Sequence, residues 1–422
     1  MRFDTLDQWL DWQSTLHPQE IELGLERVAD VWQRLKPDGL ASLVITVAGT
    51  NGKGSCVAML DSIYRQAGYR VGVYTSPHLI HYKERIKLDG KPVEDRRLCE
   101  IFDAIDKARG DTTLTYFEFG TLAALYVFAE EHPDLVILEV GLGGRLDAVN
   151  IIDADLALIS SIDLDHTDWL GETREEIGME KAGIMRPDRP VVLADPEMPN
   201  SVFTAVQQVG ARALTLGRDY NFHQTAAGWQ WSGPDGTLLN LPVPALPGLW
   251  QLQNAAAVVM ACRCLQQQLE CRDEDLVAGL EQARLPGRLQ LITGRPNVLL
   301  DVAHNPQAVR SLRSYLARHP EQSPIRAVFG LLHDKDAAAV ASIMGDSIEA
   351  WHLMDLPGNR GRLSNALAGT MRDAGITAPI HGYQTFTEAF DAARSEAKGQ
   401  GLILIFGSFL VVGEAMQYLS IE

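Results

Sequence analysis

The sequence predicts an α/β protein with two domains, each built on a mostly parallel sheet. Three observations support this fold class. Apolar, β-rich runs alternate with helical patterns over residues 43–195 and again from about residue 295. These runs are continuously apolar, as expected of strands that helices cover on both faces. Finally, 422 residues are too many for one compact core and fit two domains of ordinary size.

The N-terminal domain is expected to span residues 1–287 and to contain repeated βαβ units. Its first strands are predicted at 42–49, 69–76, 134–141, 155–162 and 189–195, with helical patterns at 55–67, 94–108 and 115–131. A Pro-Asp-Gly turn signal and alternating residues then predict a small β ribbon within 214–243. Two further helical patterns follow, at 252–269 and 273–283.

The C-terminal domain is expected to span residues 288–422 and to be smaller and Rossmann-like. The boundary lies near LPGRLQ, where Pro and Gly separate periodic segments. A second α/β alternation begins there, in which a helical stretch follows each strand. The strands are predicted within 297–306, 326–332, 350–356, 378–380 and 402–408.

Composition and charge exclude several classes of function. The N-terminal residues carry acids where a secretory signal needs a basic start, and no run approaches 18 apolar residues, so we expect a cytoplasmic protein without a membrane partner. The five cysteines form no CxxC pair, which argues against zinc and redox sites. A net charge of −18 opposes binding to a nucleic-acid backbone.

A glycine-rich loop, GTNGKGS (49–55), follows the first predicted strand and opens a predicted helix. Such a junction directs unpaired backbone N–H groups and the positive end of the helix toward one point, which favours phosphate. The glycines let phosphate oxygens approach, and Lys53 can neutralise their charge. The usual P-loop pattern is only partly met, because position 47 is Val and Gly54 separates Lys53 from Ser55. The alternative is a glycine-rich turn with a solvated lysine.

Several polar residues lie where predicted elements end. Glu139 closes the apolar run LVIL, which places a carboxylate at the carboxyl end of a strand, where ligands of open α/β sheets bind. A structural salt bridge is the alternative. His166 lies in an acidic loop, where a polar surface residue is the ordinary interpretation. Lys181 is near the end of a helix that Thr173 and Glu176 would cap, where a cation favours the helix dipole.

The motifs together resemble a known family. They occur in the order and spacing of the dihydrofolate synthase/folylpolyglutamate synthases, which belong to the muramyl-peptide (Mur) ligase superfamily. The resemblance runs over most of the chain. It is carried by GTNGKGS, TSPHL (75–79), LEVGLGGRLDA (138–148), DHTDWLG (165–171), EKAGI (180–184), LPGR (285–288), DVAHNP (301–306) and HDKD (333–336).

This resemblance implies an ATP site and two Mg²⁺ ions. Ser76 and Glu139 would hold one ion, although general P-loop logic would assign Ser55 to the metal instead. His166 and a carbamylated Lys181 would hold the second ion. Lys53, Lys181, His166 and Glu139 would be the catalytic residues. The nucleotide would contact Thr50, Asn51, Gly52, Lys53, Gly54, Ser55, Asn254, Arg288, Asp301 and His304.

The ATP residues come from both predicted domains, so domain closure is expected to be part of the mechanism. The loop residues His304, His333, Asp334 and Lys335 are expected to help position the incoming glutamate. The aromatic segment LTYFEFGTLAAL (114–125) resembles the pterin-binding segment of the family, and ELGLER (22–27) matches another substrate-side segment. The implied dihydropteroate contacts are Thr115, Tyr116, Phe117, Glu118, Leu146, Asp147 and Ala148. Core packing is the alternative for two of the three aromatics in 116–119.

The implied activity is ATP-dependent amide synthesis. L-Glutamate would be added to 7,8-dihydropteroate, and tetrahydrofolate would then be extended with γ-linked glutamates, each time through an acyl phosphate. We expect a monomer acting on small molecules. The main alternative is a folylpolyglutamate synthase without the first activity. A P-loop switch or transport ATPase would instead turn over ATP without glutamate. A peptidoglycan Mur ligase would need a longer segment before the loop. No general base is identified.

Overall fold

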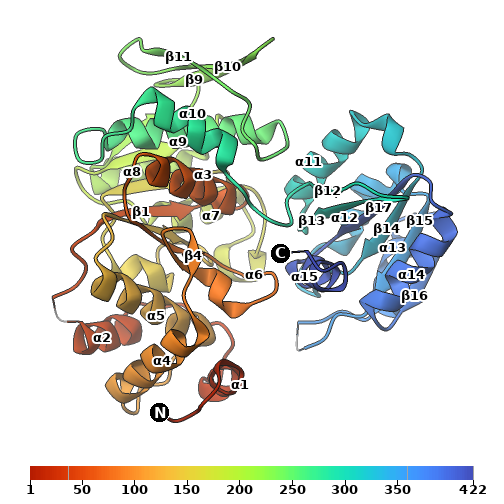
Figure 1. Ribbon diagram of the computed structural model, residues 1–422, viewed down its shortest axis with the longest axis horizontal. Coiled ribbons are helices and arrows are strands. Elements are labelled where there is room, and N and C mark those ends of the chain that lie inside the picture. The colour runs from red at the N-terminus through yellow and green to blue at the C-terminus, as the bar shows by residue number, and fades with distance from the viewer. Residues whose placement is uncertain (37, 359, 422) are drawn as a thin grey trace. The chain divides into compact units, whose positions relative to one another are not determined.

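The computed structural model describes residues 1–36, 38–358 and 360–421, which form two compact units (Figure 1). Unit 1 comprises Met1–Ala245 and Gln251–Arg284, and unit 2 comprises Leu246–Trp250 and Leu285–Glu422. The two units have sheets of eight and six strands. The predicted fold class, a mostly parallel N-terminal α/β domain followed by a smaller α/β domain, is confirmed.

The sheet of unit 1 has the order β4-β3-β2-β5-β1-β6-β7-β8, in which β3 pairs antiparallel with both β2 and β4 and the other pairs are parallel. Its strands are β1 (Leu43–Ala48), β2 (Val71–Tyr74), β3 (Ile86–Leu88), β4 (Lys91–Pro92), β5 (Leu135–Glu139), β6 (Leu156–Ile159), β7 (Pro190–Leu193) and β8 (Arg212–Thr215). Strands β5 and β1 lie at the centre. Because parallel strands end at the same edge, the residues after β1, β2, β5 and β6 lie near one another.

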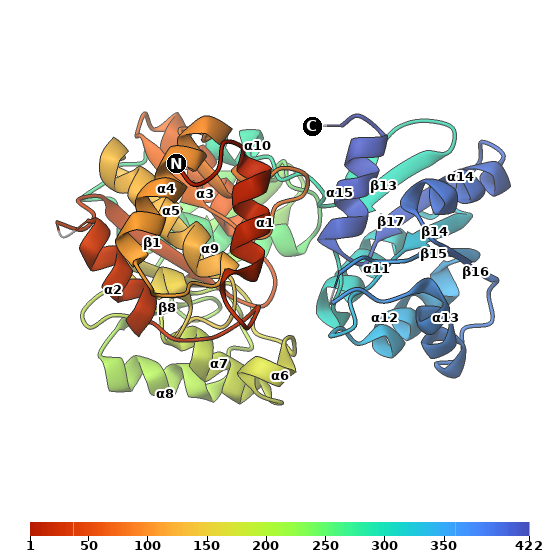
Figure 2. The ribbon, with the colours of Figure 1, turned by 90° about the horizontal axis from the view of Figure 1, so that it is seen from below.

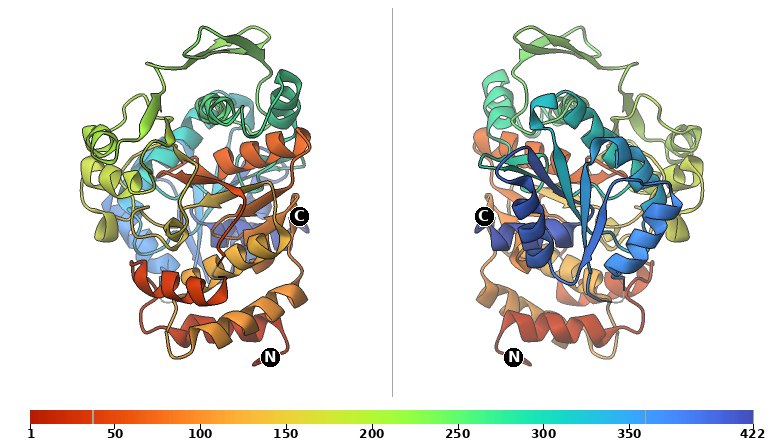
Figure 3. Two further views of the ribbon diagram at one scale, coloured as in Figure 1. Left: turned by 90° about the vertical axis from the view of Figure 1, so that its left-hand side faces the viewer. Right: turned by 90° about the vertical axis from the view of Figure 1, so that its right-hand side faces the viewer.

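Helices cover both faces of this sheet (Figures 1 and 3). One layer contains α3, α9 and α10, and the opposite layer contains α2, α4 and α5, while α7 and α8 lie side by side (Figure 2). The helices of unit 1 are α1 (Leu6–Leu16), α2 (Glu26–Leu35), α3 (Lys53–Gln66), η1 (Tyr82–Arg85), α4 (Asp95–Arg109), α5 (Tyr116–Glu131), η2 (Ala148–Ile151), α6 (Thr167–Leu170), α7 (Arg174–Ala182), α8 (Asn200–Val209), α9 (Trp250–Cys264) and α10 (Asp273–Gln282).

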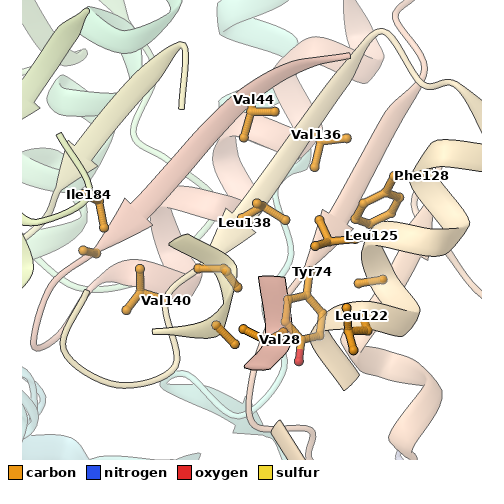
Figure 4. Close-up of a cluster of buried hydrophobic side chains, with 14 of the residues drawn as sticks. Val28, Val44, Tyr74, Leu122, Leu125, Phe128, Val136, Leu138, Val140 and Ile184 are labelled. Carbon is orange, nitrogen blue, oxygen red and sulfur yellow. The ribbon is translucent and has the colours of Figure 1, made fainter. Parts of the chain in front are cut away.

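The core of unit 1 forms where the apolar strands meet α5. Figure 4 shows Val44, Val136 and Leu138 on the strands facing Leu122, Leu125 and Phe128 on α5. All six side chains are buried. Helix α5 is apolar on almost every side, which fits its position between the sheet and α4. This packing fixes the helix whose first turn carries the predicted substrate residues.

The ribbon predicted within 214–243 is a separate antiparallel sheet of three strands, in the order β11-β10-β9. Its strands are β9 (Asn221–Thr225), β10 (Gly228–Ser232) and β11 (Leu238–Leu241). Trp229 and Trp231 are buried, and their indole N–H groups donate to Pro242 O and Ala256 O. The Trp231 bond therefore anchors the ribbon to α9, whereas the Trp229 bond lies within the ribbon segment.

Unit 2 has the strand order β12-β13-β17-β14-β15-β16, in which only β12 is antiparallel. A helix follows each predicted strand, as expected. The elements are β12 (Gln290–Ile292), β13 (Asn297–Asp301), α11 (Pro306–Ala317), η3 (Pro320–Gln322), β14 (Ile325–Phe329), α12 (Ala337–Met344), η4 (Gly345–Ser347), β15 (Ala350–Met354), α13 (Ser364–Asp373), β16 (Ile380–Tyr383), α14 (Phe386–Ala397), β17 (Leu402–Phe406) and α15 (Phe409–Tyr418). No helix in the described part of the chain is long and apolar enough to cross a membrane.

Candidate functional site

The loop between β1 and α3 has a backbone that only glycine suits at two positions. Gly49 and Gly52 have φ angles of 149° and 89°. A Cβ on Gly49 would lie 1.9 Å from Ser160 Oγ, so even a methyl group does not fit there. Lys53, Gly54 and Ser55 form the first turn of α3, whose N–H groups have no partner within the helix. The N–H groups at the start of α3 are therefore suited to binding an anion.

Residues that follow β6 hold this loop in place through hydrogen bonds. Thr50 N donates to Ser161 O (2.7 Å), and Thr50 Oγ1 donates to Asp163 O (3.0 Å). Ser160 Oγ donates to Asn51 O (2.7 Å). Thr50 and Asn51, both predicted to bind nucleotide, are thus held by their backbone and hydroxyl groups. The two serines were not predicted, although their position directly after an apolar strand could have indicated them.

Two lysines converge on the carbonyl of Gly49. Lys53 Nζ donates to Gly49 O (3.0 Å), and Lys181 Nζ donates to the same oxygen (3.1 Å). Lys181 lies near the end of α7, which has the predicted capping box of Thr173 and Glu176. Its side chain is buried, with the residue 4% exposed. Lys181 thus lies in the last turn of its helix, as predicted, but its side chain is buried against the glycine loop.

The electrostatic surroundings favour an uncharged Lys181 amine. Burial lowers the pKa of Lys181 to about 7, and the charge of Lys53 lowers it as well. The charges of Asp165 and Asp147 act in the opposite direction. Because a neutral amine is the nucleophilic form, this lysine is suited to covalent modification near neutral pH. The same interactions link α7 to the loops that contain Asp147 and Asp165.

Glu139 and Ser76 meet at the carboxyl ends of the neighbouring strands β5 and β2. Ser76 N donates to Glu139 Oε2 (3.2 Å), and Glu139 is 6% exposed. His166 begins α6 with a positive φ of 52°, and its N–H contacts Asp165 Oδ1 (2.9 Å). This loop reaches the glycine loop through Asp163, whose N–H donates to Thr50 Oγ1 (3.1 Å).

These residues suit a magnesium site. Mg²⁺ prefers oxygen ligands, and it is usually held by one or two carboxylates together with phosphates and water. Glu139 supplies such a carboxylate beside the hydroxyl-bearing Ser76. Among the residues that the structure describes, no three or more His, Cys, Asp or Glu side chains gather as a closed metal cage.

Helix α9 contributes side chains to the first turn of α3. Gln251 Nε2 donates to Ser55 Oγ (3.1 Å), and Asn254 Nδ2 donates to Gln251 Oε1 (3.0 Å). A Cβ on Gly52 would lie 2.8 Å from Asn254 Oδ1, so Asn254 lies directly against the loop. Gln251 was not predicted, although it precedes Asn254 by three residues and so shares its face of the helix.

The predicted acceptor residues surround the first turn of α5. Thr115 caps this helix, and Glu118 Oε2 accepts from Thr115 N (2.8 Å) and Thr115 Oγ1 (2.9 Å). Glu118 Oε1 accepts from Arg27 Nε (2.7 Å), and Arg27 also contacts Glu22. The buried Glu118 carboxylate therefore holds the helix start and the 22–27 segment together. Tyr116 and Phe117 are half-buried, whereas Phe119 belongs to the core.

Asp147 lies in the loop after β5, between Leu146 and Ala148. Its carboxylate accepts from Leu142 N (2.8 Å) and Val149 N (3.1 Å). Burial raises the pKa of Asp147 to about 6, while these backbone N–H groups act in the opposite direction. Leu146 O accepts from Gly24 N (3.3 Å), and Ala148 is buried. The 22–27 segment therefore contacts both predicted groups of substrate residues.

In unit 2, the remaining residues that were predicted to bind nucleotide lie near the end of β13. Asp301 Oδ2 accepts from Leu289 N (2.9 Å), and Oδ1 accepts from Ala303 N (2.8 Å). Burial raises the pKa of Asp301, and the charge of Arg288 opposes that rise. Arg288 and His304 share an aromatic neighbour, Phe409, with the guanidinium carbon of Arg288 5.2 Å from its ring centroid.

The HDKD motif of unit 2 lies in the loop after β14. Asp334 Oδ2 accepts from Arg360 Nη2 (2.7 Å). Arg362 Nη2 donates to His333 O (2.7 Å) and to Lys335 O (3.2 Å). Two arginines from the 360–362 segment therefore hold the backbone and one carboxylate of this loop. They were not predicted, because their contacts are distant in sequence.

Comparisons with known proteins identify relatives along almost the whole chain. Residues 47–262 match the Mur ligase middle domain, and residues 287–409 match the Mur ligase glutamate ligase domain. The chain is 42% identical to the dihydrofolate synthase/folylpolyglutamate synthase of Escherichia coli, covering 98% of this chain and 95% of that protein.

Solved structures show the same similarity. E. coli FolC in complex with DHPP and ADP has a TM-score of 0.93 and 42% identity, with 99% of this chain and 98% of that chain covered. A bifunctional folylpolyglutamate synthase/dihydrofolate synthase with Mn, AMPPNP and L-glutamate bound has a TM-score of 0.89 and 42% identity, again covering 99% and 98%. The first of these structures therefore holds DHPP and ADP, and the second holds Mn, AMPPNP and L-glutamate.

Proposed function

The chain belongs to the dihydrofolate synthase/folylpolyglutamate synthase family of Mur ligases, and on this basis we propose that it carries out both reactions for which that family is named. It is an ATP-dependent ligase. It adds L-glutamate to 7,8-dihydropteroate to give dihydrofolate, and it extends tetrahydrofolate with γ-linked glutamates. The observation that carries this proposal is the convergence of Lys53 and Lys181 on Gly49, in a helix-start loop suited to phosphate.

Each reaction proceeds in two steps. A carboxylate oxygen of the acceptor attacks the γ-phosphorus of ATP, and the bond to the β-phosphate oxygen breaks to release ADP. The α-amine of L-glutamate then attacks the acyl phosphate, forms the amide, releases phosphate and loses one proton. No nucleophilic side chain is needed, so the protein contributes mainly positioning and charge.

The residues of the β1–α3 junction bind and orient the phosphates. The N–H groups at the start of α3 donate to phosphate oxygens, and Lys53 Nζ turns from Gly49 O toward the transferred group, neutralising its charge. Ser55 has its hydroxyl fixed by Gln251. Asn254 holds the loop from the side, and we propose that it also contacts the nucleotide together with Arg288, Asp301 and His304.

Glu139, Ser76, His166 and Lys181 are the proposed residues for two Mg²⁺ ions. When bound, Mg²⁺ supplies positive charge that stabilises the phosphoryl group during transfer. The proposal is supported by the contact of Ser76 with Glu139 and by the burial of Glu139, whose strand β5 pairs with β1 directly before the glycine loop.

We propose that Lys181 is carbamylated. Its neutral amine attacks CO₂, a C–N bond forms, and one proton is released, which converts a cation into a carboxylate-like anion. The support is geometric and electrostatic: the amine is buried beside Gly49, and its pKa is lowered to about 7 by burial and by Lys53. An anion in place of a second ammonium group removes the repulsion from Lys53 and creates an oxygen ligand for a metal.

The acceptor is proposed to bind against the first turn of α5 and the 146–148 loop. Tyr116 and Phe117 offer half-buried aromatic faces for a flat pterin ring. Asp147 offers a buried carboxylate that can accept from pterin N–H groups. Thr115 and Glu118 position this turn.

One assay tests the function. The purified protein is given ATP, Mg²⁺ and radiolabelled L-glutamate, with either 7,8-dihydropteroate or tetrahydrofolate as acceptor. We expect labelled product with each acceptor, and about 100- to 1,000-fold less of it with Lys53→Ala. Product with tetrahydrofolate alone would reduce the activity to folylpolyglutamate synthesis. ATP turnover that depends on neither acceptor nor glutamate would contradict the ligase assignment.

A further inference from the structure

Arg85 is a buried cation without a carboxylate partner among the described residues. It ends η1 and is 9% exposed. Its Nε donates to His78 Nδ1 (2.9 Å). Its two terminal nitrogens donate to no other described residue, and neither is among the fully enclosed polar atoms. These nitrogens can therefore donate hydrogen bonds to a bound ligand.

Neutral aromatic groups surround the guanidinium. Its central carbon lies 5.3 Å from the ring centroid of Tyr82 and 5.4 Å from that of Tyr116. Burial raises the pKa of Tyr74 to about 12, and the charge of Arg85 opposes that rise. Cation–π contacts offset part of the cost of burying the charge. They do not replace an anion, and arginine cannot become neutral by losing a proton.

The position of Arg85 at the end of η1, directly before β3, brings it close to the proposed reaction centre. Its carbonyl accepts from Thr75 N (2.9 Å), the residue before Ser76. Ser76 N in turn donates to Glu139. Arg85 thus lies at the edge of the sheet where the strands deliver the proposed metal ligands. On its other side it contacts Tyr116, one of the proposed acceptor residues.

We propose that Arg85 binds a carboxylate of the acceptor substrate. This inference rests on the proposed function, which requires an acceptor with a carboxylate at this edge of the sheet. The terminal nitrogens can form two parallel hydrogen bonds to the two oxygens of such a group. Binding would supply the missing negative charge, and the rings of Tyr82 and Tyr116 would hold the guanidinium plane in place.

A comparison of two ligands tests this inference. Dihydropteroate and an analogue with hydrogen in place of its carboxylate are titrated calorimetrically, with Mg²⁺ and a nonhydrolysable ATP analogue present. Arg85→Met is expected to weaken dihydropteroate binding about 10- to 100-fold and to leave binding of the analogue unchanged. Arg85→Lys, which keeps the charge, should lose less affinity for dihydropteroate than Arg85→Met does. Arg70→Met is the matched control, because Arg70 is half exposed and pairs with Asp89 and Glu131.

An equal loss for both ligands would show that Arg85 only supports the fold, and an unchanged affinity for dihydropteroate would overturn the inference directly. If Arg85→Met does not fold, the same comparison is made with Arg85→Lys, where a loss restricted to dihydropteroate is expected and an equal loss contradicts the inference. A wild-type protein that binds neither ligand would overturn the proposed function and this inference with it.

Discussion

The side chain of Lys53 is held within the loop that is proposed to bind phosphate. Its ammonium group donates to two carbonyls of its own loop, Gly49 O (3.0 Å) and Thr50 O (3.4 Å). Both carbonyls belong to the segment expected to contact phosphate, so the Lys53 ammonium group would need to move only a short distance to reach a bound phosphate. Replacing Lys53 with alanine should leave this loop in place, because Thr50 and Asn51 are held by residues after β6.

We expect Lys53→Ala to lower product formation with either acceptor by about 100- to 1,000-fold, since it removes one positive group that stabilises the transferred phosphoryl. The free energy of unfolding should change little. Steady-state turnover and urea unfolding measure the two effects. Lys107→Ala, at an exposed lysine paired with Asp103, serves as the control. Retained turnover in Lys53→Ala would mean that the loop does not cradle the phosphates.

Lys181 leads to a pH-dependent prediction. Its pKa is lowered from the usual 10.5 to about 7, so the amine loses its proton as pH rises through about 7. CO₂ reacts only with this neutral form. Activation of CO₂-depleted enzyme by bicarbonate should therefore increase between about pH 6 and pH 8, and it should not require the strongly alkaline pH that an ordinary lysine needs. Activity measured after incubation at each pH tests this.

The matched variant is Lys181→Ala, which should be nearly inactive and should respond to no bicarbonate at any pH. Short carboxylic acids should restore part of its activity by supplying the missing carboxylate, while leaving the wild type unchanged. A fully active Lys181→Ala would show that the lysine is unmodified or unnecessary.

At the scale of elements, the sequence indicated the strands and the helices that follow them because their apolar runs are long and continuous. It also located Glu139 and Asp301, since a carboxylate directly after such a run must lie at a strand end. The N-terminal helices α1 and α2, the β3–β4 hairpin, α6, α8, β8 and β12 were not predicted. Each of these is short or amphipathic and is stabilised by packing against distant segments.

The candidate site shows the same difference between local features, which could be predicted, and contacts between distant segments, which could not. The glycine loop could be predicted because its chemistry is local. The contacts of Arg27 with Glu118 and of Gln251 with Ser55 could not, because they join residues separated by 91 and 196 positions. No spacing rule connects such pairs, and only the folded chain brings them together. The buried state of Lys181 was missed for the same reason, since it depends on the loop of Gly49.

The link between Arg27 and Glu118 should stabilise the start of α5. Arg27→Met leaves the buried Glu118 carboxylate with only its Thr115 partners. We therefore expect the free energy of unfolding to fall by about 1–3 kcal/mol. The double variant Arg27→Met/Glu118→Gln should recover part of this loss, because the uncompensated charge is gone. Arg34→Met, at an exposed arginine of α2, is the control. Strictly additive losses in urea unfolding would contradict a direct interaction.

At the scale of the whole molecule, the net charge of −18 means that anionic substrates must be bound by a few local groups. Lys53 and the helix start are in unit 1, as is Arg85. Arg288 and Asp301, which are proposed to contact the nucleotide, are in unit 2. The proposed nucleotide contacts are therefore distributed over two units that each have their own sheet and core.

This distribution predicts how ATP affects stability. A ligand that binds only folded protein raises its stability by about 2.7 kcal/mol at 100 times the dissociation constant. If residues of both units contact the nucleotide, a nonhydrolysable ATP analogue with Mg²⁺ should raise the unfolding temperature of both units. Calorimetry measures the unfolding temperatures, and hydrogen exchange measures the protection of each unit.

Asp301→Ala should reduce the protection that the ATP analogue gives to unit 2 and keep the protection of unit 1, whereas Lys53→Ala should reduce the protection of both units. Protection confined to unit 1 in the wild type would show that unit 2 does not contact the nucleotide, and that Arg288 and Asp301 have another role.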